Sequence, residues 1–254
     1  MKVVLSIVSH SQDDLVLNFF ESINKEEFLK FSNEYTFIVT HNLEKRINFK
    51  ERFNFLEIIE IENEVSKSFG INHNQAFKTK ESNIFIVTNP DIEFLEGNLE
   101  KFVNYLDASS HCLIVPQIKE PNKQVFTPLR NRLSFKELFL RFYFMVILKK
   151  NTSFKELDLS KPFWACGIFM AFKSEIYRKL EGFDETIFMY YEDADLSRRL
   201  VLNKKSLGSS DLLTLKHIGN RSSHKKFRLL ISHIFSAIRI NFFRKWAKIN
   251  DSSL

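Results

Sequence analysis

The sequence contains little cysteine: only Cys112 and Cys166 occur among its 254 residues. The two thiols lack the close spacing of cysteine metal ligands, and a single pair does not make a disulfide framework. Cysteines used this sparingly are typical of buried thiols in a reducing compartment. A disulfide-stabilised secreted domain and a cysteine-based metal centre are therefore excluded.

Long uncharged hydrophobic runs are also lacking. No stretch reaches the roughly 18 apolar residues that a membrane-spanning helix needs. Arg141 interrupts Leu138–Leu148, and Arg228 and Arg239 bound Leu229–Ile238. The first residues, MKVVLSIVSHSQDD, contain only a short apolar run and do not have the layout of a signal peptide. These absences predict a cytoplasmic protein.

Positive charge is in excess, with a formal net charge of +6 and a pI of about 9.1. Hydrophobic residues make up 44%, which is typical of a globular chain. A basic balance favours an anionic partner, namely a phosphorylated substrate, an acidic membrane surface or nucleic acid. The excess is concentrated near the end of the chain, at Lys225, Lys226, Arg228, Arg239, Arg244, Lys245 and Lys248.

The first half alternates short β-branched runs with segments of helical periodicity. This alternation predicts an α/β fold with a mostly parallel, Rossmann-like sheet flanked by helices. We expect strands at Val3–Val8, Tyr35–Thr40, Leu56–Ile61, Asn83–Thr88 and Cys112–Pro116, and helices at Asp13–Phe28, Ser66–Lys78 and Leu99–Leu106.

The second half is less regular. We expect a strand at Phe163–Phe172 and helices at Phe135–Leu148, Ser174–Leu180, Glu192–Leu202 and Lys225–Trp246. The resulting division is a main domain at 1–220, with a first half at 1–118 and a second half at 119–220, followed by a basic amphipathic extension at 221–254.

Polar residues follow three of the predicted strands: Ser9-His10, His41-Asn42 and Asn89-Pro90-Asp91. Ligands of parallel sheets bind beyond the carboxyl ends of the strands, so these positions are candidate ligand contacts. A carboxylate such as Asp91 at a strand end is suited to Mg²⁺ or Mn²⁺, which take oxygen ligands and substrate phosphates. The alternative is an ordinary turn, because Asn, Pro and Asp all favour turns.

Glu192, Asp193 and Asp195 form a second carboxylate cluster at a predicted helix start. Acids are stabilised there by the helix dipole, and Asp195 is spaced to pair with Arg199, so a structural explanation is open. The preceding Ile187–Tyr191 is apolar and aromatic, which would desolvate an acid and suit it to act as a base. His217 is either a structural histidine or a further metal ligand.

Taken together, these motifs resemble the family 2 glycosyltransferases of GT-A fold, especially the bacterial rhamnosyltransferase-like branch. The resemblance extends from Lys2 to about Trp246 and is most specific in the block Gly182–Leu196. The other matching segments are VLSIVSH, Phe69–Ala76, Asn89–Ile92, Trp164–Gly167, His217 and Arg221–Ser223.

The resemblance implies an inverting transfer of a sugar from a nucleotide-diphosphate sugar, such as a dTDP- or UDP-sugar, to a hydroxyl of a glycan or lipid-linked glycan in bacterial surface polysaccharide synthesis. Asp193 would be the catalytic base, and Asp91 and His217 would hold Mn²⁺ or Mg²⁺. The implied donor contacts are Ser9, His10, His41, Asn42, Asn74, Asn89 and Asp91, and Trp164, Gly167 and Glu192 would shape the acceptor and sugar pocket.

One departure from the family pattern concerns base recognition. The family usually carries an Asp after its second strand that helps bind the nucleotide base, and His41 stands at that position here. The identity of the donor base is therefore less well determined than the catalytic roles.

The C-terminal segment Lys225–Trp246 combines an apolar stripe with flanking cations. Such a helix is suited to an anionic membrane surface, which would place the protein at the periphery of the inner membrane. The alternative is packing on the catalytic domain or on a partner subunit.

Three other functions compete with sugar transfer. A non-catalytic nucleotide or glycan binder would share the fold but would need no base. A nucleic-acid-binding protein would interleave basic and aromatic residues, whereas the basic cluster here is terminal, so no nucleic acid partner is expected. A metal-dependent phosphatase or nuclease would need more ligands near Asp91.

Overall fold

The computed structural model describes residues 1–45, 47–121, 123–130, 164–188 and 191–219. The predicted helices at Phe135–Leu148 and Lys225–Trp246, and the segment Arg221–Ser223, lie outside these residues. No helix in the described part of the chain is long and apolar enough to span a membrane.

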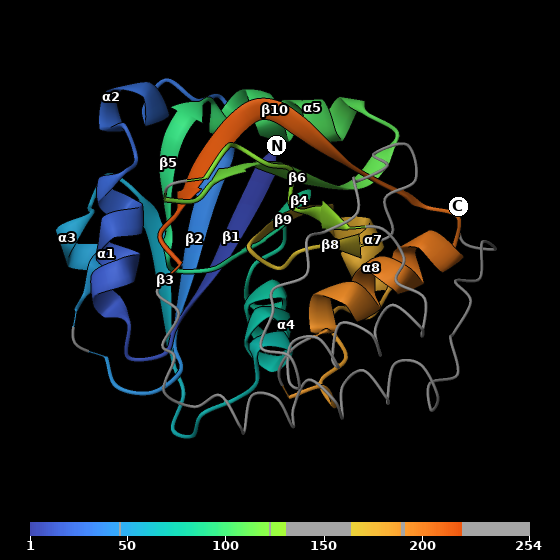
Figure 1. The fold of residues 1–254 in the computed structure, drawn as a ribbon. Helices are drawn as coiled ribbons and strands as arrows, with labels where there is room; N and C mark the ends of the chain where they lie inside the picture. Colours follow the sequence, from blue (N-terminus) through green and yellow to red (C-terminus); the bar gives the residue numbers. More distant parts are fainter. Residues whose placement is uncertain (46, 122, 131–163, 189–190, 220–254) are drawn as a thin grey trace, which may run out of the picture.

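An eight-stranded sheet forms the centre of the molecule, in the order β3-β2-β1-β4-β9-β6-β10-β5 (Figure 1). Six strands run in one direction, and β9 and β5 run against them, because both pair antiparallel with their neighbours. The strands are β1 (Lys2–Ser9), β2 (Glu34–His41), β3 (Glu57–Glu62), β4 (Ile84–Thr88), β5 (Ile92–Gly97), β6 (His111–Lys119), β9 (Phe169–Lys173) and β10 (Ser206–His217). A second, two-stranded antiparallel sheet consists of β7 (Leu129–Arg130) and β8 (Trp164–Ala165).

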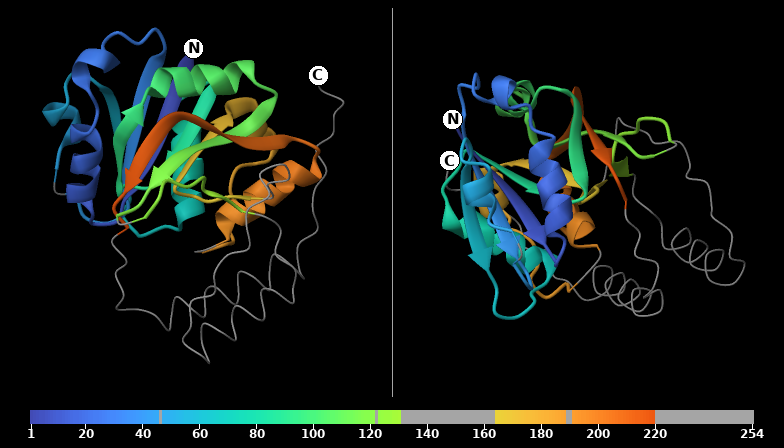
Figure 2. Two further views of the ribbon diagram at one scale, coloured as in Figure 1. Left: turned by 45° about the horizontal axis from the view of Figure 1, so that its top comes forward. Right: turned by 90° about the vertical axis from the view of Figure 1, so that its left-hand side faces the viewer.

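Helices cover both faces of the sheet (Figure 2). Alternate side chains of the buried strands point to opposite faces, so each face builds its own hydrophobic core. Leu5 faces the core under the helices of one side, and Val4 faces the core under those of the other. The first side carries α1 (Asp13–Glu21), α2 (Lys25–Phe28), α3 (Phe49–Arg52) and α5 (Leu99–Ala108), and the second carries α4 (Phe69–Thr79), α7 (Ser174–Lys179) and α8 (Glu192–Leu202).

The predicted mostly parallel α/β architecture is confirmed, with several differences in its elements. The helix predicted at Asp13–Phe28 is two helices, because Asn24 caps the start of α2 through the Glu27 N–H. The strand predicted at Phe163–Phe172 is divided into β8 and β9 around the Cys166-Gly167 step. The sequence pattern does not predict strands β5, β7 and β10 or the short helix α3.

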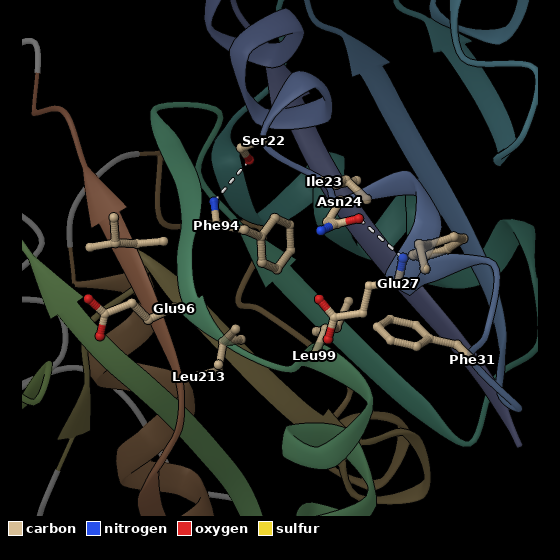
Figure 3. Close-up of a pocket in the computed structure, with 12 residues that line it drawn as sticks. Ser22, Ile23, Asn24, Glu27, Phe31, Phe94, Glu96, Leu99 and Leu213 are labelled. Carbon is tan, nitrogen blue, oxygen red and sulfur yellow. Dashed lines mark hydrogen bonds between the residues drawn. The ribbon is translucent and has the colours of Figure 1, made fainter.

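A groove of about 190 Å³ lies beside the end of α1, between α2 and β5 (Figure 3). Phe31, Phe94 and Leu213 contribute to its apolar lining. β5 begins next to Asp91 and ends at Gly97, so the groove lies toward the opposite edge of the sheet from the carboxyl ends of β1 and β4. It is therefore separate from the residues that the sequence singles out.

Candidate active site

Asp91 and His217 lie side by side at the carboxyl edge of the sheet. The antiparallel register of β10 on β5 pairs His217 with Ile92, and the Ile218 N–H donates to the Asp91 carbonyl at 2.9 Å. Nε2 of His217 then lies 3.3 Å from Oδ2 of Asp91, with side-chain exposures of 15% and 18%. Pairing between strands thus brings together two residues that are far apart in the sequence.

The Asp91–His217 pair has the geometry of two ligands of one cation. Adjacent ligands of an octahedral Mg²⁺-like ion, with bonds of 2.0–2.1 Å, are about 3 Å apart. The second carboxylate oxygen of Asp91, Oδ1, is buried and finds no hydrogen-bond partner among the described residues. A bound cation would satisfy this oxygen, so the residues fit a divalent metal, although no cluster of three His, Cys, Asp or Glu ligands occurs in the described residues.

The electrostatics of His217 follow from the same neighbours. Burial lowers the pKa of its imidazole, but the carboxylates of Asp91 and Glu120 outweigh burial, and the net pKa is raised. Glu120 lies on the other side of the ring, 3.4 Å from Nδ1. Sequence reasoning missed Glu120, because nothing in the local sequence signals its approach to His217.

Asp193 occupies the first turn of α8 and is held by backbone donors. The Gly167 N–H donates to Oδ2 at 2.8 Å, and the Ala194 N–H donates to Oδ1 at 2.7 Å. A Cβ on residue 167 would lie 3.6 Å from Oδ2, so glycine leaves open space beside the carboxylate. The half-buried carboxylate is thereby fixed in orientation at the end of the Trp164–Gly167 segment.

Asp193 and Asp91 belong to the same edge of the sheet. β9 pairs antiparallel with β4, so the start of β9 lies beside the end of β4, with Thr88 opposite Phe169. The Asn89 N–H donates to the Ile168 carbonyl at 3.0 Å, and the adjacent Gly167 holds Asp193. A short path of backbone contacts therefore connects the candidate metal ligand to the candidate base.

Glu192 and Asp193 form an electrostatically coupled pair of acids. Burial and the adjacent Asp193 charge raise the pKa of Glu192 to about 8. Burial also raises the pKa of Asp193, while the N–H donors of Gly167 and Ala194 favour its ionised form. Oε2 of Glu192 is buried without a hydrogen-bond partner among the described residues. We therefore expect Glu192 to be protonated at neutral pH, with the negative charge of the pair on Asp193.

This assignment predicts a pH dependence. Because the pKa of Glu192 is higher in the folded protein (about 8) than in an unfolded chain (4.5), protonation of Glu192 stabilises the fold fully below pH 4.5, and the stabilisation is lost as pH rises through 8. Glu192→Gln, which cannot ionise, should therefore gain thermal stability relative to wild type between pH 5 and pH 9. Melting temperatures across this range test it, with Glu175→Gln at an exposed position as the control. A constant difference at all pH values would contradict the assignment.

Trp164 and Arg130 lie beside the acids. β7 pairs with β8 so that Arg130 is opposite Trp164, and the Trp164 ring meets the Tyr191 ring edge-on, with centroids 6.4 Å apart. The positive charge of Arg130 lowers the pKa of Asp193, although the net shift from burial is upward. Tyr191 adopts a left-handed conformation (φ 68°) at the N-cap of α8, an unfavourable backbone state that turns the chain into the helix carrying Asp193.

Ser9 and Asn42, both predicted donor contacts, have partners within the protein. The Ser9 hydroxyl donates to Asp13 and is fully buried. The Asn42 amide accepts from the Lys67 N–H at 2.8 Å and donates to the Lys67 carbonyl at 2.9 Å, so it holds the segment that leads into α4. His10 is exposed beside it, with Nδ1 3.2 Å from Asn42 Nδ2.

The His41 side chain lies fully inside the fold. Its Nε2 is 3.1 Å from Oε1 of Glu60, its Nδ1 is 3.6 Å from Oδ1 of Asp13, and its ring stacks on Phe49. The imidazole is enclosed by two carboxylates and an aromatic ring. This arrangement argues against the predicted contact between the His41 side chain and a nucleotide base.

Asn74 also has a full set of internal partners. Its carbonyl oxygen accepts from the Tyr177 hydroxyl at 2.7 Å and from the Phe183 N–H at 2.9 Å, and its amide donates to the Phe183 carbonyl and to Glu185. A carboxamide with two acceptor and two donor contacts has no capacity left for a ligand. The structure therefore favours a scaffold role, in which Asn74 ties α4 to the loop before α8, over the predicted donor contact.

Comparison with known proteins agrees with the resemblance drawn from the sequence. No protein-family model matches the chain. Rhamnosyltransferase WbbL of Escherichia coli (strain K12) is 23% identical over 212 residues, which cover 79% of this chain and 77% of WbbL. The likeness thus extends over most of both proteins.

Solved GT-A glycosyltransferases resemble this chain. S. aureus TarS 1-349 superimposes on 86% of this chain with a TM-score of 0.58 and 13% sequence identity. GalNAc-T7, solved with UDP, GalNAc and Mn²⁺, superimposes on 85% of this chain with a TM-score of 0.59 and 13% sequence identity. The mannosyltransferase PcManGT from Pyrobaculum calidifontis, in complex with GDP-Man and Mn²⁺, gives 0.59 at 13% identity over 93%. The chain spans 60%, 43% and 64% of these three structures, respectively. The predicted GT-A fold is confirmed.

Proposed function

We propose that the protein is a metal-dependent, inverting glycosyltransferase that uses a nucleotide-diphosphate sugar. The observation that carries this function is the Asp193 carboxylate, fixed by the Gly167 N–H and connected through Ile168 and Asn89 to the Asp91–His217 pair. A base and a cation site at one edge of a GT-A sheet are what direct transfer to a hydroxyl requires. The likeness to WbbL supports a rhamnosyltransferase-like activity on a glycan or lipid-linked glycan acceptor in surface polysaccharide synthesis.

The proposal gives each group a role. Asp91 and His217 would hold Mn²⁺ or Mg²⁺, which stabilises the negative charge of the departing nucleoside diphosphate. Asp193 accepts the proton of the acceptor hydroxyl as its oxygen bonds to the anomeric carbon and the bond to the diphosphate breaks. One displacement inverts the anomeric configuration. Trp164 and protonated Glu192 lie beside Asp193, where they would contact the acceptor or the donor sugar.

The function is tested by a thermal-shift screen of nucleoside diphosphates and nucleotide sugars with Mn²⁺ or Mg²⁺, followed by measurement of diphosphate release. We expect one nucleotide sugar to stabilise the protein in the presence of metal and to be turned over. A non-catalytic binder would be stabilised without turnover, which would overturn the proposal.

The cytoplasmic location stays a prediction. The peripheral contact of residues 221–254 with the inner membrane also stays a prediction.

The Asp91 site predicts metal-dependent donor binding. Asp91→Ala should weaken binding of the selected nucleotide sugar in Mn²⁺ by at least about 10-fold, because loss of a ligand should cost no less than loss of a residue that supports a ligand, while binding in EDTA should match wild type. Isothermal titration calorimetry with and without Mn²⁺ measures the difference, and Asp107→Ala, at an exposed position on α5, is the control. A donor affinity that is unchanged in Mn²⁺ would contradict the assignment of Asp91.

A further inference from the structure

Glu120 lies against the side of His217 that faces away from Asp91. β6 and β10 run parallel with Lys119 opposite Lys216, so the residues that follow, Glu120 and His217, are also neighbours. Oε1 of Glu120 is 3.4 Å from Nδ1 of His217, and both side chains are largely buried. The imidazole is thus placed between two carboxylates, one on each ring nitrogen.

The two oxygens of Glu120 have separate partners. Lys123 donates to Oε2, three residues further along the chain, while Oε1 is directed to His217. The carboxylate is therefore anchored on one side and presented to the imidazole on the other. Because Nδ1 and Nε2 point in different directions, Glu120 on Nδ1 is not placed to share a cation with Asp91 on Nε2.

A histidine that binds a metal through one nitrogen carries its proton on the other. A carboxylate that accepts this proton in a hydrogen bond fixes the tautomer and the orientation of the ring, and it makes the ligating nitrogen more basic. Loss of such a partner commonly lowers metal affinity without removing a ligand.

We propose that Glu120 is a positioning residue for a divalent cation, because it accepts the Nδ1–H of His217 and so directs the Nε2 lone pair to the space shared with Asp91. This inference deepens the proposed function and rests on it for the presence of the metal site. It adds a residue that the Asp91–His217 pair alone does not reveal.

The experiment measures Mn²⁺ affinity of the full chain, without nucleotide, from the electron paramagnetic resonance signal of unbound Mn²⁺. Glu120→Ala should weaken Mn²⁺ binding by about 10- to 100-fold. Glu120→Gln should recover a large part of the affinity lost in Glu120→Ala, because its amide oxygen still accepts the Nδ1–H although the carboxylate charge is gone. Glu93→Gln, which removes a carboxylate that pairs with Lys216 beside the site, is the charge-matched control and should stay within about threefold of wild type.

The outcomes separate this inference from the proposed function. The positioning role would be overturned if Glu120→Ala bound Mn²⁺ as tightly as wild type while His217→Ala bound it more weakly. It would also be overturned if Glu120→Ala and Glu120→Gln lost Mn²⁺ affinity equally. Wild-type affinity no higher than that of Asp91→Ala would overturn it as well. If only the proposed function fails, the variants still show the expected differences in Mn²⁺ affinity, but wild type turns over no nucleotide sugar.

Discussion

Asp193→Asn is expected to lower the rate of sugar transfer by about 10²- to 10⁴-fold, the range that a positioned general base contributes. The amide removes the group that takes up the acceptor proton, while the Asp91–His217 pair that would hold the donor diphosphate is unchanged. Donor affinity should therefore stay close to wild type. The measurement is turnover of the nucleotide sugar selected by the binding screen, together with calorimetry of donor binding.

Two controls make the Asp193 result interpretable. Asp193 accepts two backbone N–H groups, and an amide can accept only through its oxygen, so the melting temperature of Asp193→Asn must be measured to exclude a folding defect. Asp211→Asn makes the same chemical change at an exposed position of β10 and should leave turnover unaltered. Turnover of Asp193→Asn within a few-fold of wild type would remove Asp193 from the role of base.

The elements that could be predicted from the sequence are those that local patterns specify. Strands β1, β2 and β4 are short β-branched runs buried on both faces, which is the pattern of central parallel strands. Helix α8 was predicted with its observed bounds, Glu192–Leu202, because acids at its start and periodic apolar residues coincide. The strand-end position of Asp91 followed from the same reasoning.

The elements that were missed depend on distant partners. β5 follows directly after the turn at Asp91, and β10 contains Gly208 and several serines, so neither has the composition of a typical strand. Both are stabilised by pairing, since β10 lies between β6 and β5. The position of Glu120 beside His217 is a consequence of that register, and it was therefore not visible in the sequence.

Asn74 and His41 show a second limit of sequence reasoning. Both are polar residues near predicted ligand-binding segments, which is also where buried polar residues that support a site occur. The distinction depends on hydrogen-bond partners from other parts of the chain, such as Tyr177 and Phe183 for Asn74 and Glu60 for His41. Counting these partners requires the fold, so the sequence pattern alone could not separate supporting residues from ligand contacts.

Arg199 connects α8 to the loop that precedes it, and Arg199→Leu should have the largest effect on stability. The buried guanidinium donates to Asp195 at 2.9 Å, to the Gly182 carbonyl at 2.7 Å and to the Leu180 carbonyl. Removing one partner of a buried ion pair leaves the other charge uncompensated and costs about 3–5 kcal/mol of unfolding free energy. Urea denaturation measures this loss.

Two comparison variants assign the effect of Arg199→Leu to the buried pair. Arg178→Leu makes the same substitution at an exposed arginine of α7, which lies 5.5 Å from the Phe77 ring, and should cost no more than about 1 kcal/mol. The double variant Arg199→Leu with Asp195→Leu removes both charges and should recover part of the loss, because no uncompensated carboxylate stays in the core. A loss in Arg199→Leu as small as that in Arg178→Leu would show that the buried pair does not hold the segment carrying Asp193 in place.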